Sequence, residues 1–188
     1  MVTPILLMLV VIVADFGRVF AANLAIEAAA RNAAEAVANQ YLASPPGGRL
    51  DQPAVAGSST YYSPLHTLAA KTVCSETSDL SNSTFDSSSG LCPGMPLVQV
   101  CIHDSQDTEC ATEAQGASIP ASCDSMAAPP TNAHGGSGTP RWAEVRVCYK
   151  FTPILSNMPL LSFATMWLQR TRTFVIPCYW ATGATECG

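Results

Sequence analysis

The feature that most constrains the fold is a long N-terminal stretch with almost no residues that interrupt a helix. Residues 5–43 contain no proline and a single glycine, Gly17, and they are rich in Ala, Leu, Val and Ile. Alanine has the highest helix propensity, and Pro4 suits a first helical turn because its missing N–H needs no partner there. The sequence SPPGG at residues 44–48 cannot continue a helix. We therefore expect one helix over residues 5–43, about 57 Å long at ~1.5 Å per residue.

The two halves of this expected helix differ in polarity. Residues 5–14 (ILLMLVVIVA) are apolar on all sides, whereas the second half carries polar side chains at a spacing of four, namely Asn23, Glu27, Arg31 and Glu35. Residues four apart lie on one face of a helix, and Glu before Arg is the favourable order for an ion pair. The other faces of the second half are mostly alanine, which permits close approach of a neighbouring helix.

The apolar N-terminus is open to three interpretations. A cleaved signal peptide is supported by the small residues before Ala22, but such a peptide begins with positive charge and stays apolar where Asp15 and Arg18 occur. A membrane anchor needs ~20 apolar residues and would bury both of these charges, at about 2.5–3.5 kcal/mol for a lone charge. In the third interpretation the helix leaves the membrane and packs beside copies of itself in a filament. The low charged fraction, 12% against an average of ~25%, favours a surface buried against lipid or other subunits.

The filament interpretation names residues that would form contacts between subunits. Helix–helix packing is expected from Ile5, Leu6, Leu9, Ile12, Val13, Phe16, Phe20, Leu24, Ala29 and Ala33. Charges in the filament core are expected to be paired between subunits, and the candidates are Asp15, Arg18, Glu27 and Arg31. Asp15 and Arg18 are three residues apart, so they can partly neutralise each other on one helix.

Residues 44–188 are expected to form a head held together by disulfides outside the cytosol. All eight cysteines lie in this part of the chain: Cys74, Cys92, Cys101, Cys110, Cys123, Cys148, Cys178 and Cys187. An even number in one region is typical of a disulfide framework, and the closest spacing of nine residues does not fit a zinc motif. Eight cysteines allow 105 pairings, so the connectivity stays open.

The head has an α+β pattern with long loops. Residues 63–74 (SPLHTLAAKTVC) predict a short helix with Ser63 as its N-cap, and strands are expected at residues 96–103, 141–151 and 162–176, with loops at 75–96 and 104–140. In the strand RWAEVRVCYKF, one face is expected to carry Ala143, Val145, Val147, Tyr149 and Phe151. We expect a small antiparallel sheet of three strands.

Two features at opposite ends of the chain carry a family resemblance. The apolar helix reaches the step Asp-Phe-Gly-Arg at residues 15–18 and continues as an alanine-rich helix, and the strand at residues 145–151 has the pattern Val-x-Val-x-Tyr-x-Phe before a Pro- and Leu-rich turn. In this order the two features resemble the TadE-like proteins, which are pilin-like subunits of the tight-adherence (Tad) pilus in the type IV filament superfamily.

The resemblance implies a pilin-like fold and a structural subunit of an extracellular pilus, with surface adhesion as an outcome. It also implies a membrane-inserted precursor that a prepilin peptidase processes and that the pilus assembly machinery builds into a helical homo-oligomer. Such pilins usually carry a glutamate at position 5, where this chain has Ile5, and Asp15 is the candidate substitute by its position. The alternative is a membrane-anchored secreted binding module that does not polymerise.

No pattern typical of catalysis, a cofactor or a metal site occurs in the sequence. The G-x-S-x-G, P-loop and paired-carboxylate patterns are missing, which disfavours a secreted hydrolase. His66, His103 and His134 lie far apart and are expected at the surface. A net charge of −5 without a basic patch argues against nucleic acid as a partner. We therefore expect no enzymatic activity, catalytic residue, metal ligand or cofactor.

Overall fold

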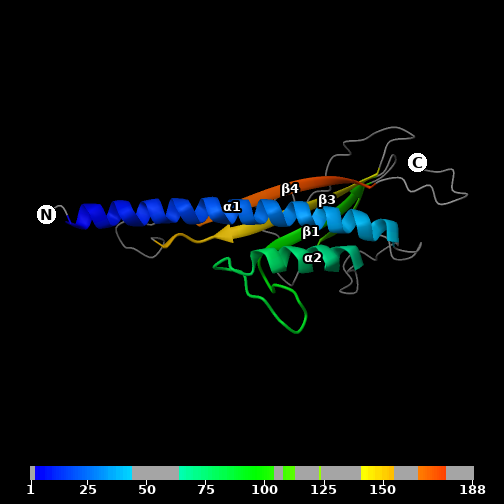
Figure 1. Cartoon of the computed structure of the whole chain (residues 1–188), viewed down its shortest axis with the longest axis horizontal. Coiled ribbons are helices and arrows are strands. Elements are labelled where there is room, and N and C mark those ends of the chain that lie inside the picture. The colour runs from blue at the N-terminus through cyan, green and yellow to red at the C-terminus, as the bar shows by residue number, and fades with distance from the viewer. Residues whose placement is uncertain are drawn as a thin grey trace, which may run out of the picture.

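The long N-terminal helix dominates the architecture of the chain. A computed structural model describes residues 3–43, 64–103, 108–112, 123, 141–154 and 165–176. The elements in chain order are α1 (Thr3–Ala43), α2 (Pro64–Thr77), β1 (Leu97–His103), β2 (Thr108–Thr112), β3 (Arg141–Phe151) and β4 (Met166–Ile176). The N-terminal half of α1 extends beyond the other elements, which gather beside its second half (Figure 1). This is the α+β, pilin-like architecture expected from the sequence.

Both helices occur where the sequence predicts them, with small differences at their ends. The predicted helix over residues 5–43 is confirmed and begins two residues earlier, at Thr3. The helix predicted to end at Cys74 continues to Thr77 instead. In this last part of the helix the hydroxyls of Ser75 and Thr77 donate to the carbonyl oxygens of Thr72 (2.8 Å) and Val73 (2.7 Å).

The sheet is antiparallel with the strand order β2-β1-β3-β4, so it has one strand more than expected. The additional strand β2 lies in the stretch predicted to be a loop, and it pairs with β1 from His103↔Thr108 to Gln99↔Thr112. Its sequence, TECAT, lacks the apolar alternation that marks a strand, because it forms the edge of the sheet. The strand predicted at residues 162–176 begins at Met166 in the described part of the chain.

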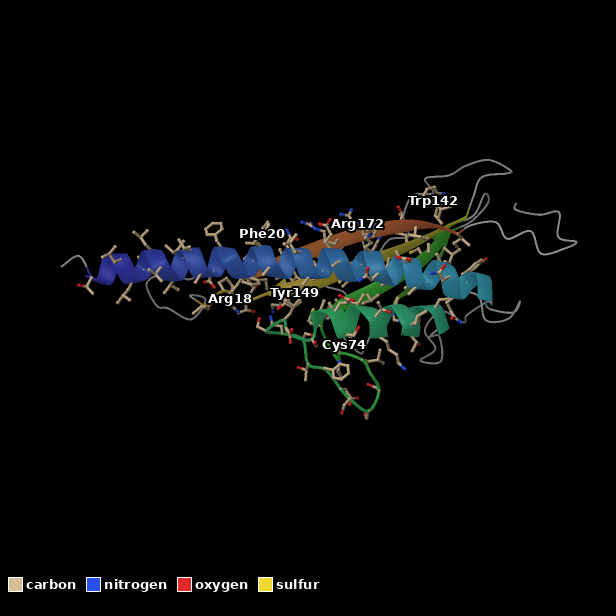
Figure 2. The ribbon with its side chains drawn as sticks, in the orientation of Figure 1. Arg18, Phe20, Cys74, Trp142, Tyr149 and Arg172 are labelled. Atoms are coloured by element: carbon tan, nitrogen blue, oxygen red, sulfur yellow. A yellow bond between two sulfur atoms is a disulfide. The ribbon has the colours of Figure 1, made fainter. Side chains whose placement is uncertain are left out.

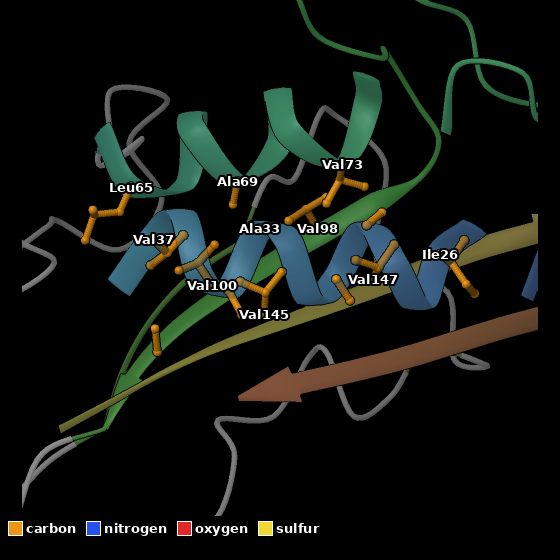
Figure 3. Close-up of a cluster of buried hydrophobic side chains, with 14 of the residues drawn as sticks. Ile26, Ala33, Val37, Leu65, Ala69, Val73, Val98, Val100, Val145 and Val147 are labelled. Atoms are coloured by element: carbon orange, nitrogen blue, oxygen red, sulfur yellow. The ribbon is translucent and has the colours of Figure 1, made fainter. Parts of the chain in front are cut away.

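The hydrophobic core lies between the two helices and one face of the sheet. The predicted alternation in β3 is confirmed, since Ala143, Val145, Val147, Tyr149 and Phe151 are all buried in this core. Val98 and Val100 of β1 lie on the same face, and α1 and α2 run antiparallel to each other across it (Figure 3). His66 of α2 is also buried, and its ring nitrogen Nε2 lies within hydrogen-bond distance, 3.1 Å, of the carbonyl oxygen of Val98. The expected surface position of His66 is therefore wrong, whereas the side chains of His103 and His134 lie outside the described residues.

The opposite face of the sheet also carries buried side chains. Leu97, Cys123 and Cys148 form a second buried cluster there, with Trp167 packed against it. Glu144 points to this face and is paired with Arg146, whose Nε lies 2.5 Å from the Glu144 carboxylate. Both side chains are largely buried, and their mutual neutralisation lowers the cost of burying two charges on this face.

Disulfides connect the described parts of the head. Cys74 of α2 is bonded to Cys92, which closes a loop of 18 residues, and Cys123 is bonded to Cys148 of β3 over a separation of 25 residues. Cys101 of β1 is also disulfide-bonded. In the backbone register of β1 with β2, residue 101 lies opposite residue 110. The predicted participation of the cysteines is thus confirmed for these five bonded residues. Cys178 and Cys187 lie outside the described residues.

Candidate assembly surface and its junction with the head

The first half of α1 presents apolar side chains that the head does not cover. We call residues 3–21 the uncovered segment. Among its described side chains only Asp15 is buried, while Phe16 is 73% exposed and Val13 is 69% exposed. Phe20 and Arg18 project from opposite sides of α1, and Arg18 points toward the head (Figure 2). Exposed apolar side chains along a helix of this length indicate a surface made for lipid or for another protein.

Most of the apolar residues predicted to pack between subunits lie on this surface. Exposed side chains occur there at Leu6, Leu9, Val13, Phe16 and Phe20, and Leu24 is exposed just beyond the segment. Ile12 is half-buried beside the head, and the side chain of Ile5 lies outside the described residues. Their exposure leaves these side chains available to a neighbouring helix.

Ala29 and Ala33 do not lie on that surface, and their predicted place between subunits is wrong. Both are 0% exposed within a single chain. Ala33 faces α2 on the inner side of α1, close to Ala69 and Val73 (Figure 3). The alanine-rich face does serve close helix packing, but its partners are the second helix and the sheet of the same chain. Small side chains on this face thus permit close packing of α1, as predicted, but the neighbouring elements belong to the same chain and not to another subunit.

The carboxylate of Asp15 ties the uncovered segment to the end of β3. The backbone N–H of Ile154 donates to both carboxylate oxygens, each at 3.1 Å, across 139 residues of sequence. Arg18 donates to the same carboxylate at 3.1 Å, so the predicted Asp15–Arg18 pair is confirmed within one chain. The guanidinium of Arg18 also lies 5.4 Å from the centre of the Phe151 ring. One buried acid thus satisfies an amide and a cation and fixes the angle between helix and sheet.

An apolar groove adjoins this junction. It has a volume of about 130 Å³. Its walls are formed by Ile12, Asp15, Phe16, Val19, Phe151, Pro153 and Met166. The groove therefore lies where α1, the end of β3 and the start of β4 meet.

Glu27 forms a second connection between α1 and the sheet. Its carboxylate pairs with Arg170 of β4, whose Nε lies 3.6 Å away, and also with Arg172. Glu27 therefore binds the head of its own chain rather than the predicted partner Arg31, which is exposed. All three paired side chains are more than a third exposed, so the contribution of this cluster to stability is about 0–1 kcal/mol.

Sequence reasoning missed the residues that receive Asp15 and Glu27. No local pattern marks Ile154, because its contribution is a backbone N–H placed by the turn at Pro153. Arg170 and Arg172 did leave a signal. They occupy core-side positions of β4 in register with Val147 and Val145, which is why the alternation in that strand is imperfect. A basic pair at core-side positions of an edge strand indicates an acid on the element packed above it.

The described residues contain no group of three or more His, Cys, Asp or Glu side chains arranged to hold a metal ion. The stretch Leu6–Tyr41 of α1 is long and apolar enough to cross a membrane, since 18 of its consecutive residues have a mean hydropathy of 1.9 and only 17% of them are buried.

A long helix with an uncovered apolar half and a disulfide-bonded head built on an antiparallel sheet defines a pilin-like protein. The family model described as TadE-like protein matches residues 1–35. The resemblance recognised in the sequence is thus confirmed for the N-terminal segment, and it associates the chain with the Tad pilus. No curated protein and no solved structure shows significant similarity to the chain.

Proposed function

We propose that this chain is a structural subunit of an extracellular Tad-like pilus and that it polymerises through the uncovered segment of α1. Before assembly the subunit resides in the cytoplasmic membrane, where a prepilin peptidase and the pilus assembly machinery act on it. The head then faces the outside and supports surface adhesion. The role is structural, without catalysis, a cofactor or nucleic acid.

The observation that carries this proposal is the change in burial along α1. From Ala22 onward the helix has an inner face that is fully buried in the head, as at Ile26 and Ala30, whereas the apolar side chains before Ala22 are mostly exposed. A helix that has already found its folding partner in its second half needs no apolar surface in its first half for its own stability. That surface is therefore kept for lipid and then for neighbouring subunits.

The TadE-like match supports the same proposal, because the matched residues 1–35 include the uncovered segment and the Asp15–Arg18 pair. The pairing of Asp15 with Arg18 and with the N–H of Ile154 neutralises the acid that the apolar segment contains. A neutralised pair is less costly to place in lipid or in a filament core than a lone charge.

The test is a comparison of two exposed phenylalanines. Phe20→Ala removes an apolar side chain from the uncovered segment, and Phe85→Ala removes a partly exposed ring, 49% exposed, from the head as a matched control. We expect fibres sheared from cells to contain this chain, with yield reduced by Phe20→Ala and unchanged by Phe85→Ala. Electron microscopy and mass spectrometry of the sheared material measure the yield.

The non-polymerising alternative gives a different result in the same experiment. A membrane-anchored binding module would be missing from sheared fibres even in the wild type, and the purified chain would remain a single particle in detergent. Equal loss of fibres in both phenylalanine variants would also contradict the proposal, since the head ring lies away from α1's uncovered segment.

A further inference from the structure

The β3–β4 hairpin reaches down alongside the uncovered segment. We call Lys150, Phe151, Ile154, Met166 and Trp167 the hairpin end. Phe151 and Met166 are paired in the β3–β4 register, and both line the groove against α1. The Asp15–Ile154 hydrogen bonds then fix the hairpin end at the level of Asp15 on the helix. The hairpin end is thus a part of the head placed next to a segment of membrane-spanning character.

The length of the uncovered segment bears on where a bilayer would lie. Residues 3–21 are 19 residues, and at ~1.5 Å per residue they extend about 28 Å. The hydrocarbon core of a bilayer is ~30 Å thick. The uncovered segment is therefore long enough for one membrane crossing, and the burial that starts at Ala22 marks the expected boundary on the head's side.

The hairpin end lies below that boundary. Asp15 is six residues before residue 21, which corresponds to about 9 Å along the helix axis at ~1.5 Å per residue. Interfacial protein segments bury their apolar faces about 5–10 Å into the boundary between headgroups and acyl chains. A subunit with its uncovered segment in the bilayer therefore brings the hairpin end to this depth.

The chemistry of the hairpin end fits that depth. Ile154 is 53% exposed and Met166 is 47% exposed, so two apolar side chains face outward where a soluble head would carry polar ones. Beside them, the ammonium of Lys150 lies 5.7 Å from the centre of the Trp167 ring. Aromatic and basic side chains are enriched at membrane–water interfaces, where the ring lies among headgroups and the charge reaches water.

The charged side chains at the level of Asp15 are paired with each other or with polar groups, which lowers the cost of placing them near lipid. Asp15 accepts hydrogen bonds from Arg18 and from the N–H of Ile154, and the Arg18 guanidinium lies over the Phe151 ring. In the middle of β4, by contrast, the exposed side chains are the polar Thr171, Arg172 and Thr173. Beyond them Val175 is 37% exposed, less than Ile154 or Met166, so apolar exposure in the described part of the hairpin is greatest at the end nearest the uncovered segment.

We propose that, in the membrane-inserted subunit, the hairpin end is immersed in the interfacial layer of the leaflet on the head's side, with Ile154 and Met166 in contact with phospholipid acyl chains. The proposal rests on the membrane stage of the proposed function and adds a second lipid contact, one made by the head. The head is then held upright on the membrane by two elements, a helix through the bilayer and a hairpin on its surface.

The experiment measures the depth of two positions at opposite ends of β4. The full-length chain is reconstituted in phosphatidylcholine vesicles, with and without phosphatidylcholine brominated on its acyl chains, which quenches tryptophan on contact. Ile154→Trp places a probe at the hairpin end, and Val175→Trp is the matched control, because Val175 is also exposed but lies near the far end of β4. The emission of the wild type, which carries Trp142, Trp167 and Trp180, is subtracted.

We expect brominated lipid to remove most of the added emission of Ile154→Trp and to leave that of Val175→Trp nearly unchanged. Met166→Trp provides a second probe if Ile154→Trp fails to form its disulfides. Equal quenching at positions 154 and 175, or quenching at neither 154 nor 166, would overturn the proposal. A blue shift of the position-154 emission without quenching would overturn it too, because it would show a protein neighbour instead of lipid.

Fibre formation by the same variants separates this inference from the proposed function. Fibres together with an unquenched probe would refute only the lipid contact of the hairpin end. A quenched probe in a chain that never appears in fibres would support the lipid contact and refute polymerisation.

Discussion

Replacing Ala33 by leucine tests where the alanine-rich face of α1 is packed. Ala33 is 0% exposed and faces α2, so the three additional carbon atoms of leucine have no free space within the chain. Overpacking of a filled core costs about 1–3 kcal/mol, because neighbouring side chains leave their preferred rotamers or the helices move apart. For a chain of this size 1 kcal/mol corresponds to about 2–4 °C in Tm, so we expect Tm to fall by about 2–12 °C.

The assay is thermal unfolding of the full chain in detergent micelles, followed by near-ultraviolet circular dichroism with the disulfides intact. Ala28→Leu is the matched control, since Ala28 lies on the exposed face of the same helix and leucine is a good helix former. We expect the control to change the free energy of unfolding by no more than about 0.5 kcal/mol. An unchanged Tm for Ala33→Leu combined with loss of fibres would refute the reasoning, because it would place Ala33 between subunits after all.

Three further predictions concern the head. Tyr149→Phe removes a buried hydroxyl that lies 3.2 Å from Ser81 Oγ and accepts the N–H of Asn82, so we expect a loss of about 0.5–1.5 kcal/mol in denaturant unfolding. Replacing Cys74 and Cys92 together by alanine opens a loop of 18 residues, and the chain-entropy relation gives a loss of ~3 kcal/mol, measurable by the same unfolding experiment. The Ser88 hydroxyl, which donates to Asp86 at 2.7 Å, holds the pKa of that carboxyl below its ordinary value of 3.8. A lowered pKa stabilises the folded loop above the unfolded-state value and loses this effect as pH falls through the folded-state value. We therefore expect the protection of the amides in residues 86–91, relative to their intrinsic exchange rate at each pH, to fall below about pH 3.8 in the wild type but to show no such transition in Asp86→Asn.

The sequence was sufficient to predict those elements whose signal is local. The absence of helix breakers over residues 5–43 predicted α1, and the strict alternation in RWAEVRVCYKF predicted both β3 and its buried face. The apolar run before Ala22 likewise predicted an exposed surface, because no head of this size can cover a helix of that length. In each case the pattern of neighbouring residues determines the result.

Features that depend on distant residues could not be predicted in this way. Strand β2 exists because β1 offers an open edge, and its own sequence carries little strand signal. The partners of Asp15 and Glu27 lie 139 and 145 residues away, so only the folded chain reveals them. The burial of Ala29 and Ala33 has the same origin, since an alanine face looks alike whether its neighbour is a second helix of the chain or another copy.

The distance in sequence between α1 and its partners sets the order in which the molecule can mature. Translation produces the alanine face first, whereas β3 and β4, which cover much of it, come from the last quarter of the chain. In the nascent chain the apolar alanine face of α1 therefore waits for β3 and β4 until synthesis is nearly complete. The head can be fully packed only after these strands have been made. A truncation before residue 141 removes β3 and β4 and leaves α2 as the main element against the alanine face, so burial of that face is complete only when the C-terminal strands are present.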